Sequence, residues 1–136
     1  MPFVYRRRVQ FAETDLAGLV HFSCFFRYME EAEHALWRAA GMSIARAGEP
    51  TGWPRLAAAF EFKAPLRFED EFEVAVGVVK VTARTLQYEF ILTKGPELIG
   101  SGTLTTAHVS KTPGGPMKAL ELPEDVVARL LKASGN

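Results

Sequence analysis

The sequence predicts an α+β fold in which a curved antiparallel sheet wraps around one long central helix. Two observations lead to this prediction. One long segment of helical periodicity, roughly Ser23 to Ala40, lies in the first third of the chain, and segments of strand-like alternation follow it, joined by tight connections. Antiparallel strands grouped after a single helix are typical of α+β layer folds. The apolar stripe of the helix is too large to stay in water, so we expect the helix to lie across the sheet.

The first third of the chain is predicted to form a strand, a loop and this helix. Phe3 to Ala12 is interpreted as a strand because its apolar residues share one parity. Glu13 to His21 forms a loop with one glycine, Gly18. The helix follows, with apolar residues recurring at steps of three and four. Ser23 is its expected N-cap, and Gly41 is its expected C-terminal stop.

The remaining elements are predicted in chain order. A short helical turn is expected over Ser43 to Ala47, before a segment broken by prolines and glycine. Four strands, a turn and a terminal helix then follow: Leu56 to Lys63, Glu71 to Ala83, a strand in which Leu86 to Leu92 alternate, Leu98 to Ser110, the Pro/Gly turn Lys111 to Pro116, and the helix Pro123 to Ala133. A strand as long as Glu71 to Ala83, unpaired at an edge, invites partners. We therefore expect at least a dimer.

Length and composition favour one domain over residues 1–136. A chain of 136 residues builds a single modest core, and a hydrophobic content of 48% is enough to bury it without disulfide bonds. Cys24 is the single cysteine, which fits a reducing compartment such as the cytoplasm. No segment reaches the length of a membrane span, and the N-terminal residues lack the apolar segment of a signal peptide.

The charge balance narrows the classes of partner. The chain has 16 Lys and Arg and 16 Asp and Glu residues, so its formal net charge is zero. Phosphate binding needs a basic surplus, so neither a nucleic acid nor an anionic membrane is expected as the main partner. The histidines His21, His34 and His108 are not paired at ligand spacing, and the sequence has neither a P-loop nor a dinucleotide glycine motif. We therefore expect no metal and no cofactor.

The loop before the helix carries the candidate chemistry. Asp15 lies three residues before Gly18, and glycine lets a ligand approach the main chain. The helix start near Phe22 and Ser23 offers free N–H groups, which can polarise a carbonyl or hold an oxyanion. A carboxylate just before it can attack that carbonyl or activate a water. Acyl transfer needs both parts. The alternative is that Asp15 is an ordinary turn residue or a charge at the helix N-terminus.

For other polar residues in and after the loop, the sequence supports a catalytic role less strongly. His21 can act as an acid or base near neutral pH, or it can be a hydrogen-bonded filler. Cys24 is conceivable as a thiol nucleophile, but its aromatic neighbours suggest burial, which keeps a thiol inert. The acids of the helix, Glu30, Glu31 and Glu33, are expected on its solvated or interface side.

The stretch VQFAETDLAGLVHFSCFFRYMEEAE resembles the hotdog-fold acyl-CoA thioesterases of the 4-hydroxybenzoyl-CoA thioesterase type. The segment FKAPLRFEDEFEV is similar to a strand–turn–strand of that family, and the order of elements is similar over roughly Val4 to Val109. The resemblance implies a hotdog fold and hydrolysis of an acyl-CoA to the free acid and coenzyme A.

The resemblance also implies roles for individual residues. Asp15 would be the catalytic nucleophile or general base, the backbone N–H near Phe22 would polarise the thioester carbonyl, and Gly18 would keep the loop open. Sites in this family lie at a dimer interface, and Arg84 and Thr85 match the region that the second subunit contributes. We place His21 with these two as a substrate-binding candidate. A homodimer or homotetramer is expected, while the acyl group is left open.

The chain departs from the family pattern at the helix start. Many bacterial relatives have His where this chain has Phe22, and often Asn and Tyr where it has Cys24 and Phe25. His21 is one position early, which argues against a histidine-assisted mechanism and does not fit the spacing of the related hotdog hydratases. These losses of polar residues motivate an alternative, a non-catalytic protein that binds acyl thioesters on the same fold. A purely structural or interaction domain is the third hypothesis, since fold does not fix function.

Overall fold

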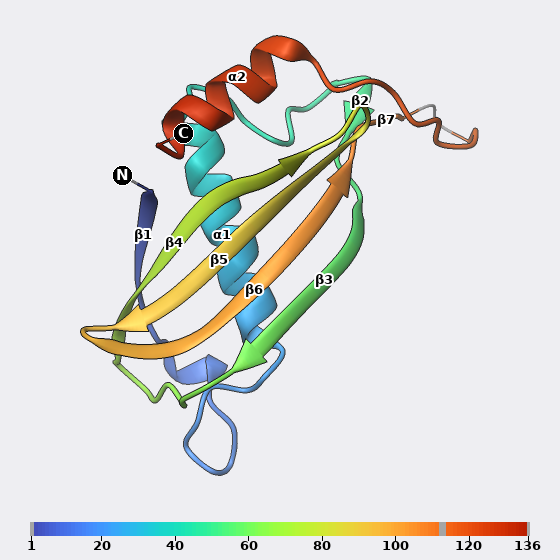
Figure 1. Ribbon diagram of the computed structural model, residues 1–136. Helices are drawn as coiled ribbons and strands as arrows, with labels where there is room; N and C mark the ends of the chain where they lie inside the picture. The colour runs from blue at the N-terminus through green and yellow to red at the C-terminus, as the bar shows by residue number, and fades with distance from the viewer. Residues whose placement is uncertain (1, 112–113, 136) are drawn as a thin grey trace.

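The computed structural model describes residues 2–111 and 114–135. A five-stranded antiparallel sheet has the spatial order β1-β4-β5-β6-β3. Its strands are β1 (Phe3–Arg8), β3 (Arg55–Phe62), β4 (Glu71–Val81), β5 (Thr85–Lys94) and β6 (Glu97–Ala107). Figure 1 shows the sheet curving around the long helix α1 (Cys24–Ala39). The predicted α+β arrangement of a curved sheet around one central helix is confirmed.

Smaller elements complete the fold at its two ends. The short strands β2 (Thr51–Gly52) and β7 (Val109–Ser110) pair with each other. The terminal helix α2 (Glu124–Ala133) lies near the C-terminal end of α1, as Figure 1 shows, and the loop that precedes α1 lies at the other end of that helix. None of the helices in the described residues has the length and apolar character that crossing a membrane requires.

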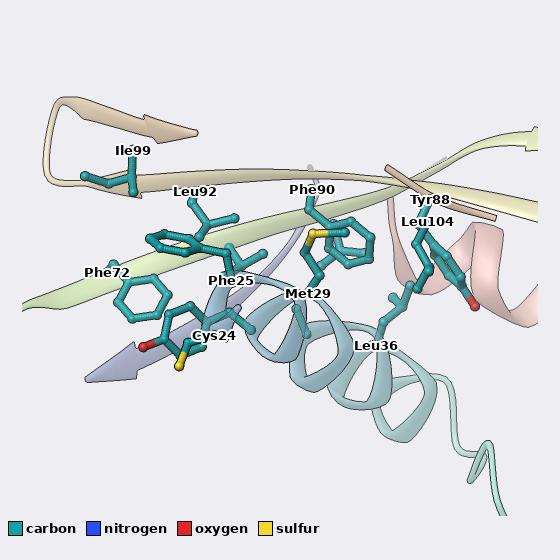
Figure 2. Close-up of a cluster of buried hydrophobic side chains, with 14 of the residues drawn as sticks. Cys24, Phe25, Met29, Leu36, Phe72, Tyr88, Phe90, Leu92, Ile99 and Leu104 are labelled. Atoms are coloured by element: carbon teal, nitrogen blue, oxygen red, sulfur yellow. The ribbon is translucent and has the colours of Figure 1, made fainter. Parts of the chain in front are cut away.

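The central helix buries one face against the concave side of the sheet. Its buried residues recur at steps of one, three and four: Cys24, Phe25, Tyr28, Met29, Ala32, Glu33, Leu36 and Trp37. Figure 2 shows Phe25 and Met29 of this face beside Phe90 and Leu92 of β5. Helix and sheet approach closely at Gly102, where an added Cβ would lie 2.7 Å from Sδ of Met29. A glycine at this position lets the helix settle on β6.

The first strand is shorter than predicted. Phe3 to Ala12 was expected to be extended throughout, but β1 ends at Arg8, and Phe11–Glu13 forms a 3-10 turn, η1. The carboxylate of Glu13 accepts the N–H of Gln10 at 2.8 Å, which closes the turn and competes with the extended conformation. As a result the ring of Phe11 is exposed, whereas Val9 is buried and Phe3 and Tyr5 are partly buried.

Three further predictions about elements are wrong. Residues 43–47 are irregular rather than a helical turn. The segment Leu98 to Ser110 is interrupted at His108, which separates β6 from β7. Strand β4 lies between β1 and β5, so it is not the edge strand that was expected to attract a partner; the edges are β1 and β3. The predicted turn over 111–116 includes residues 112 and 113, which lie outside the described residues.

Candidate functional site

The loop that carries Asp15 is a short hairpin set on the start of α1. The N–H of His21 donates to the carbonyl of Glu13 at 2.8 Å, and the N–H of Asp15 donates to the carbonyl of Leu19 at 2.8 Å. Gly18 has a φ of +79°, a backbone conformation that glycine adopts without steric cost. The local sequence has Asp15 three residues before Gly18, and both are residue types that favour tight turns.

The carboxylate of Asp15 supports this turn with one oxygen. Oδ1 accepts the N–H of Ala17 at 2.9 Å and the N–H of Leu19 at 3.2 Å. Oδ2 has no hydrogen-bond partner among residues 2–111 and 114–135. Asp15 is exposed, so this second oxygen is accessible to a ligand. Asp15 is therefore a turn residue, as one interpretation of the sequence held, and it also presents a free carboxylate oxygen.

The helix start presents a free N–H close in sequence to this carboxylate. The N–H of Cys24 donates to the carbonyl of His21 at 2.9 Å, and the N–H of Phe25 donates to that of Phe22 at 3.3 Å. The N–H of Phe22 itself has no partner within the part of the chain that the structure describes. An unpaired N–H at the positive end of a helix can donate a hydrogen bond to a carbonyl oxygen or an oxyanion.

His21, rather than Ser23, provides the side-chain acceptor at this helix start. Ser23 occupies the N-cap position, as predicted, but its side chain makes no capping hydrogen bond. Instead the N–H of Ser23 donates to Nδ1 of His21 at 3.3 Å, and the Ser23 hydroxyl lies 2.8 Å from the same nitrogen. The imidazole also stacks on the ring of Phe22, with centroids 4.6 Å apart. If Nδ1 accepts the Ser23 N–H, Nε2 is the ring nitrogen that can carry a proton.

A partly buried ionic cluster lies beneath the Asp15 hairpin. Arg7 of β1 donates to both carboxylate oxygens of Glu13, with Nη1 2.9 Å from Oε1, and its Nε donates to Glu31 at 2.9 Å. The Tyr28 hydroxyl donates to Glu13 at 2.9 Å. Burial opposes ionisation of Glu13, but hydrogen bonds from Arg7, the Gln10 N–H and Tyr28 outweigh it and lower the pKa of the carboxyl.

Sequence reasoning missed this cluster, although one signal for it was present. Phe3, Tyr5 and Val9 were assigned one parity of the first strand, and Arg7 shares that parity. An arginine on the apolar side of a strand needs a partner, because an unpaired buried charge is costly. The same reasoning applies to Glu33, which was expected on the solvated side of the helix but is fully buried and paired with Arg55.

Large apolar side chains are exposed around the site. Phe11, Leu16, Phe22, Phe62 and Phe68 all have at least 49% of their surface exposed. Phe11 and Phe68 are in edge-to-face contact at 5.6 Å, and Phe62 contacts the buried ring of Phe25 at 5.3 Å. Exposed aromatic residues gathered at one end of a molecule indicate a surface that is covered by a ligand or by another protein.

The other predicted substrate-binding residues are not brought to Asp15 within one chain. The Asp15 loop contacts residues just before β4, with Val20 donating to the carbonyl of Leu66. Arg84 and Thr85 follow the far end of β4, a strand of 11 residues, which spans about 35 Å at ~3.3 Å per residue. In Figure 1 this turn and the Asp15 loop lie at opposite ends of the sheet. Within one chain these two residues therefore do not share a site with Asp15.

The remaining candidates are accounted for by structural contacts. Cys24 is buried, and its Sγ lies 3.7 Å from the carbonyl of Glu13, so it is not an exposed thiol. His108 is buried and stacks on Trp53, with centroids 4.7 Å apart. In the described residues, no group of three or more His, Cys, Asp or Glu side chains has the arrangement of a metal site.

Comparison with known proteins identifies relatives of this arrangement. The model of the thioesterase-like superfamily matches residues 9–130. The "Putative esterase" of Aquifex aeolicus (strain VF5) is 36% identical over 128 residues, covering 93% of this chain and 96% of that protein. The structure of a gentisyl-coenzyme A thioesterase superposes with a TM-score of 0.84 at 25% identity, covering 94% of this chain and 99% of that one.

A further solved structure supports the fold. The 1,4-dihydroxy-2-naphthoyl-CoA thioesterase from Synechocystis superposes with a TM-score of 0.87 at 20% identity, covering 96% of each chain. The sheet order, the enclosed helix and this likeness together confirm the hotdog fold that the sequence resemblance implied.

Proposed function

The chain belongs to the thioesterase-like superfamily, and from this premise we propose that it hydrolyses an acyl-CoA thioester to the free acid and coenzyme A. Membership of the superfamily supports thioester hydrolysis as the general activity. Coenzyme A as the thiol is the finer step of the proposal, and it is supported by the gentisyl-coenzyme A thioesterase among the similar structures.

One observation carries the proposed chemistry. A free carboxylate oxygen on Asp15 and a free N–H on Phe22 lie on two short segments tied together by the hydrogen bond between His21 and Glu13. In the proposed reaction the thioester oxygen accepts the Phe22 N–H. Asp15 either attacks the carbonyl carbon, releasing the coenzyme A thiolate and leaving an anhydride that water cleaves, or removes a proton from an attacking water. Either route forms an oxyanion that the N–H stabilises.

The neighbouring residues fit substrate-binding roles in this proposal. Gly18 keeps the hairpin narrow, and an added Cβ there would meet no atom within 4 Å, so the space above it is open to a ligand. The exposed side chain of His21 lies at the helix start, where its second ring nitrogen, Nε2, can serve as a hydrogen-bonding group for a substrate. The exposed aromatic residues at this end offer an apolar wall to an acyl group.

We further propose that two copies associate and share the site. Strand β3 is an edge strand, and its middle residues, Ala57, Ala58 and Ala59, are exposed and uncharged. The other edge, β1, carries Arg6 and Arg8 in exposed ion pairs, a common protection against edge pairing. A second copy pairing along β3 would place its Arg84 and Thr85 on the side of the Asp15 loop, where a bulky anionic thiol ester needs cations.

The experiment that tests the function is thiol release from a panel of acyl-CoAs, measured with a thiol-reactive dye. We expect the native chain to turn over one class of acyl-CoA and Asp15→Asn to lose at least ~100-fold in kcat, because Asn neither attacks nor accepts a proton. Asp70→Asn is the matched control, since Asp70 is also a turn acid that accepts a backbone N–H, at 2.8 Å from Arg67. Native turnover by Asp15→Asn would remove Asp15 from the mechanism.

The second candidate function is acyl-thioester binding without hydrolysis. The observation that favours it is the apolar helix start, where Phe22 and Phe25 stand at positions that are often polar in similar enzymes. It predicts heat of binding with acyl-CoAs in calorimetry and no thiol release from any member of the panel. Release of thiol by the native chain rules it out.

A further inference from the structure

Glu13 contacts the candidate site with its backbone and the protein interior with its side chain. Its carbonyl accepts the N–H of His21 at 2.8 Å, the hydrogen bond that joins the Asp15 hairpin to the start of α1. Its carboxylate accepts from Arg7, Tyr28 and the N–H of Gln10. What holds this one side chain therefore contributes to the position of the hairpin.

Arg7 is the member of a run of three arginines that faces inward. The side chains of Arg6 and Arg8 are 77% and 65% exposed and pair with Glu73 and Glu71 on the outer side of the sheet edge. The side chain of Arg7 is 12% exposed, and that of Glu13 is 13% exposed. Arg7 also lies over the ring of Tyr28, 5.0 Å from its centroid. A bidentate pair in this environment is held more tightly than a pair in water.

The hairpin has few other contacts that fix it. Asp15, Leu16, Ala17 and Gly18 are all exposed. Beyond its own hydrogen bonds, the loop is attached through Val20 to Leu66 and through the bridge between Leu19 and Arg67. A loop with so little buried surface opens readily when an anchor is lost.

We propose that Glu13, clamped by Arg7 and Tyr28, is a positioning residue that sets the geometry between the Asp15 carboxylate and the Phe22 N–H. The proposal rests on the proposed function and deepens it, since Glu13 acts through Asp15 and makes no contact with substrate. Displacements of about 1 Å in a reacting group can cost ~100-fold in rate. The clamp therefore affects the chemical step more than the affinity for substrate.

The test compares three isosteric variants in the thiol-release assay. Glu13→Gln keeps the shape but removes the charge that holds Arg7, and we expect kcat to fall at least ~10-fold with KM changed less than ~3-fold. Tyr28→Phe removes one hydrogen bond to the same carboxylate, and we expect a smaller fall, about 2–5-fold in kcat. Glu71→Gln, which removes the exposed partner of Arg8, is the matched control and leaves both constants unchanged.

A second measurement separates positioning from loss of fold. All assays are run below the unfolding transition of each variant, located by circular dichroism, so that the folded fraction is the same. In the Asp15→Asn background, Glu13→Gln is expected to cause no further loss of the residual rate, because the group that it positions has already been replaced.

The outcomes distinguish this inference from the proposed function. Full activity in Asp15→Asn contradicts the proposed function, whatever Glu13 does. Loss of activity in Asp15→Asn, together with native kcat in both Glu13→Gln and Tyr28→Phe, leaves the function standing and overturns the positioning role. Independent losses that multiply in the double variant also overturn it, as does a rise in KM at constant kcat. If Glu13→Gln does not fold, the milder Tyr28→Phe decides between a lowered and a native kcat.

Discussion

Asp15 and Phe22 contribute different atoms to the candidate site, one a side-chain oxygen and the other a backbone N–H. The carboxylate of Asp15 holds its own hairpin with Oδ1 and leaves Oδ2 free. The ring of Phe22 is 63% exposed and packs on His21, while its N–H is left unbonded by the helix start. Loss of a polar side chain at this position therefore leaves the oxyanion donor intact.

Removing the N–H of Phe22 should slow catalysis strongly, whereas removing its ring should have little effect. Phe22→Pro eliminates the donor, and because Phe22 precedes Cys24, the first residue of α1, the change removes no hydrogen bond of the helix. We expect kcat to fall about 100–1000-fold, the usual cost of an oxyanion-hole donor. Phe22→Ala keeps the N–H and serves as the control, with kcat within ~5-fold of native. Equal thiol-release rates for the two variants would mean that the N–H does not hold the oxyanion.

The candidate site residues could be predicted from the sequence, but the ionic cluster around Glu13 could not. Asp15, Gly18 and the helix start could be proposed because turn chemistry and helix periodicity are local signals. The clamp on Glu13 joins residues that are distant in sequence, Arg7 and Tyr28, and appears once β1 and α1 pack together. The alternation of β1 indicates that Arg7 faces inward, but it does not indicate which acidic residue pairs with Arg7.

At the scale of elements, the contact between α1 and the start of β3 depends on a buried ion pair. Glu33 of α1 is fully buried and accepts from both terminal nitrogens of Arg55. Burial raises the pKa of Glu33 above its usual value even though Arg55 acts to lower it. Arg55 also reaches Glu30, at 3.2 Å, on the exposed side of the helix. One arginine thus links β3 to two turns of α1.

Breaking this pair should destabilise the chain in a way that depends on pH. In Arg55→Met, Glu33 is left buried without its partner, and the expected loss in free energy of unfolding near pH 8 is about 3–5 kcal/mol. The folded-state pKa of Glu33 is raised from 4.5, so its stabilising contribution is present below about pH 4.5 and is lost as pH rises through the folded value. The deficit of the variant should therefore shrink towards pH 5.

Urea unfolding at pH 5 and pH 8 measures this effect. Glu30→Gln removes the exposed partner of the same arginine and should cost below ~1 kcal/mol at either pH. A deficit in Arg55→Met that is the same at both pH values would show that an ionised Glu33 is not its source.

Element type was easier to predict than element ends and sheet order. The helix and the alternating strands β4 and β5 formed as expected because hydrophobic periodicity determines which face is buried. The end of β1 was missed because the Glu13 carboxylate competes for the backbone at Gln10. The edge position of β3 was missed because strand order depends on which strands pair. The hydrophobic pattern of one strand does not predict which strand lies beside it.

At the scale of the whole molecule, the two ends of the sheet carry complementary parts of the proposed site. The Asp15 loop and the exposed aromatic residues lie at one end, and the turn with Arg84 lies at the other, beyond the 11 residues of β4. The first end contains the proposed reacting groups, the Asp15 carboxylate and the Phe22 N–H, but not Arg84 and Thr85, which are proposed to bind the substrate. An antiparallel arrangement of two copies along β3 would bring unlike ends together twice, giving two equivalent sites by two-fold symmetry.

Mixed dimers test whether the site is shared. Asp15→Asn should lack turnover, and Arg84→Ala should keep turnover with KM raised about 10-fold, the cost of one charge-assisted contact. In a dimer with one chain of each kind, one site contains the native Asp15 of the Arg84→Ala chain and the native Arg84 of the Asp15→Asn chain. Co-expression in equal amounts should restore native KM in about a quarter of all sites, since half of the dimers are mixed and each has one intact site.

The same experiment has a result that separates a shared site from a site built within one chain. If Arg84 served the Asp15 of its own chain, every site with a native Asp15 would carry the Arg84→Ala change. The mixture would then show the raised KM alone, with half the activity of the Arg84→Ala protein. A biphasic dependence of rate on acyl-CoA concentration, with its tight phase at native KM, therefore requires that the Asp15 loop of one copy works with the β4–β5 turn of another.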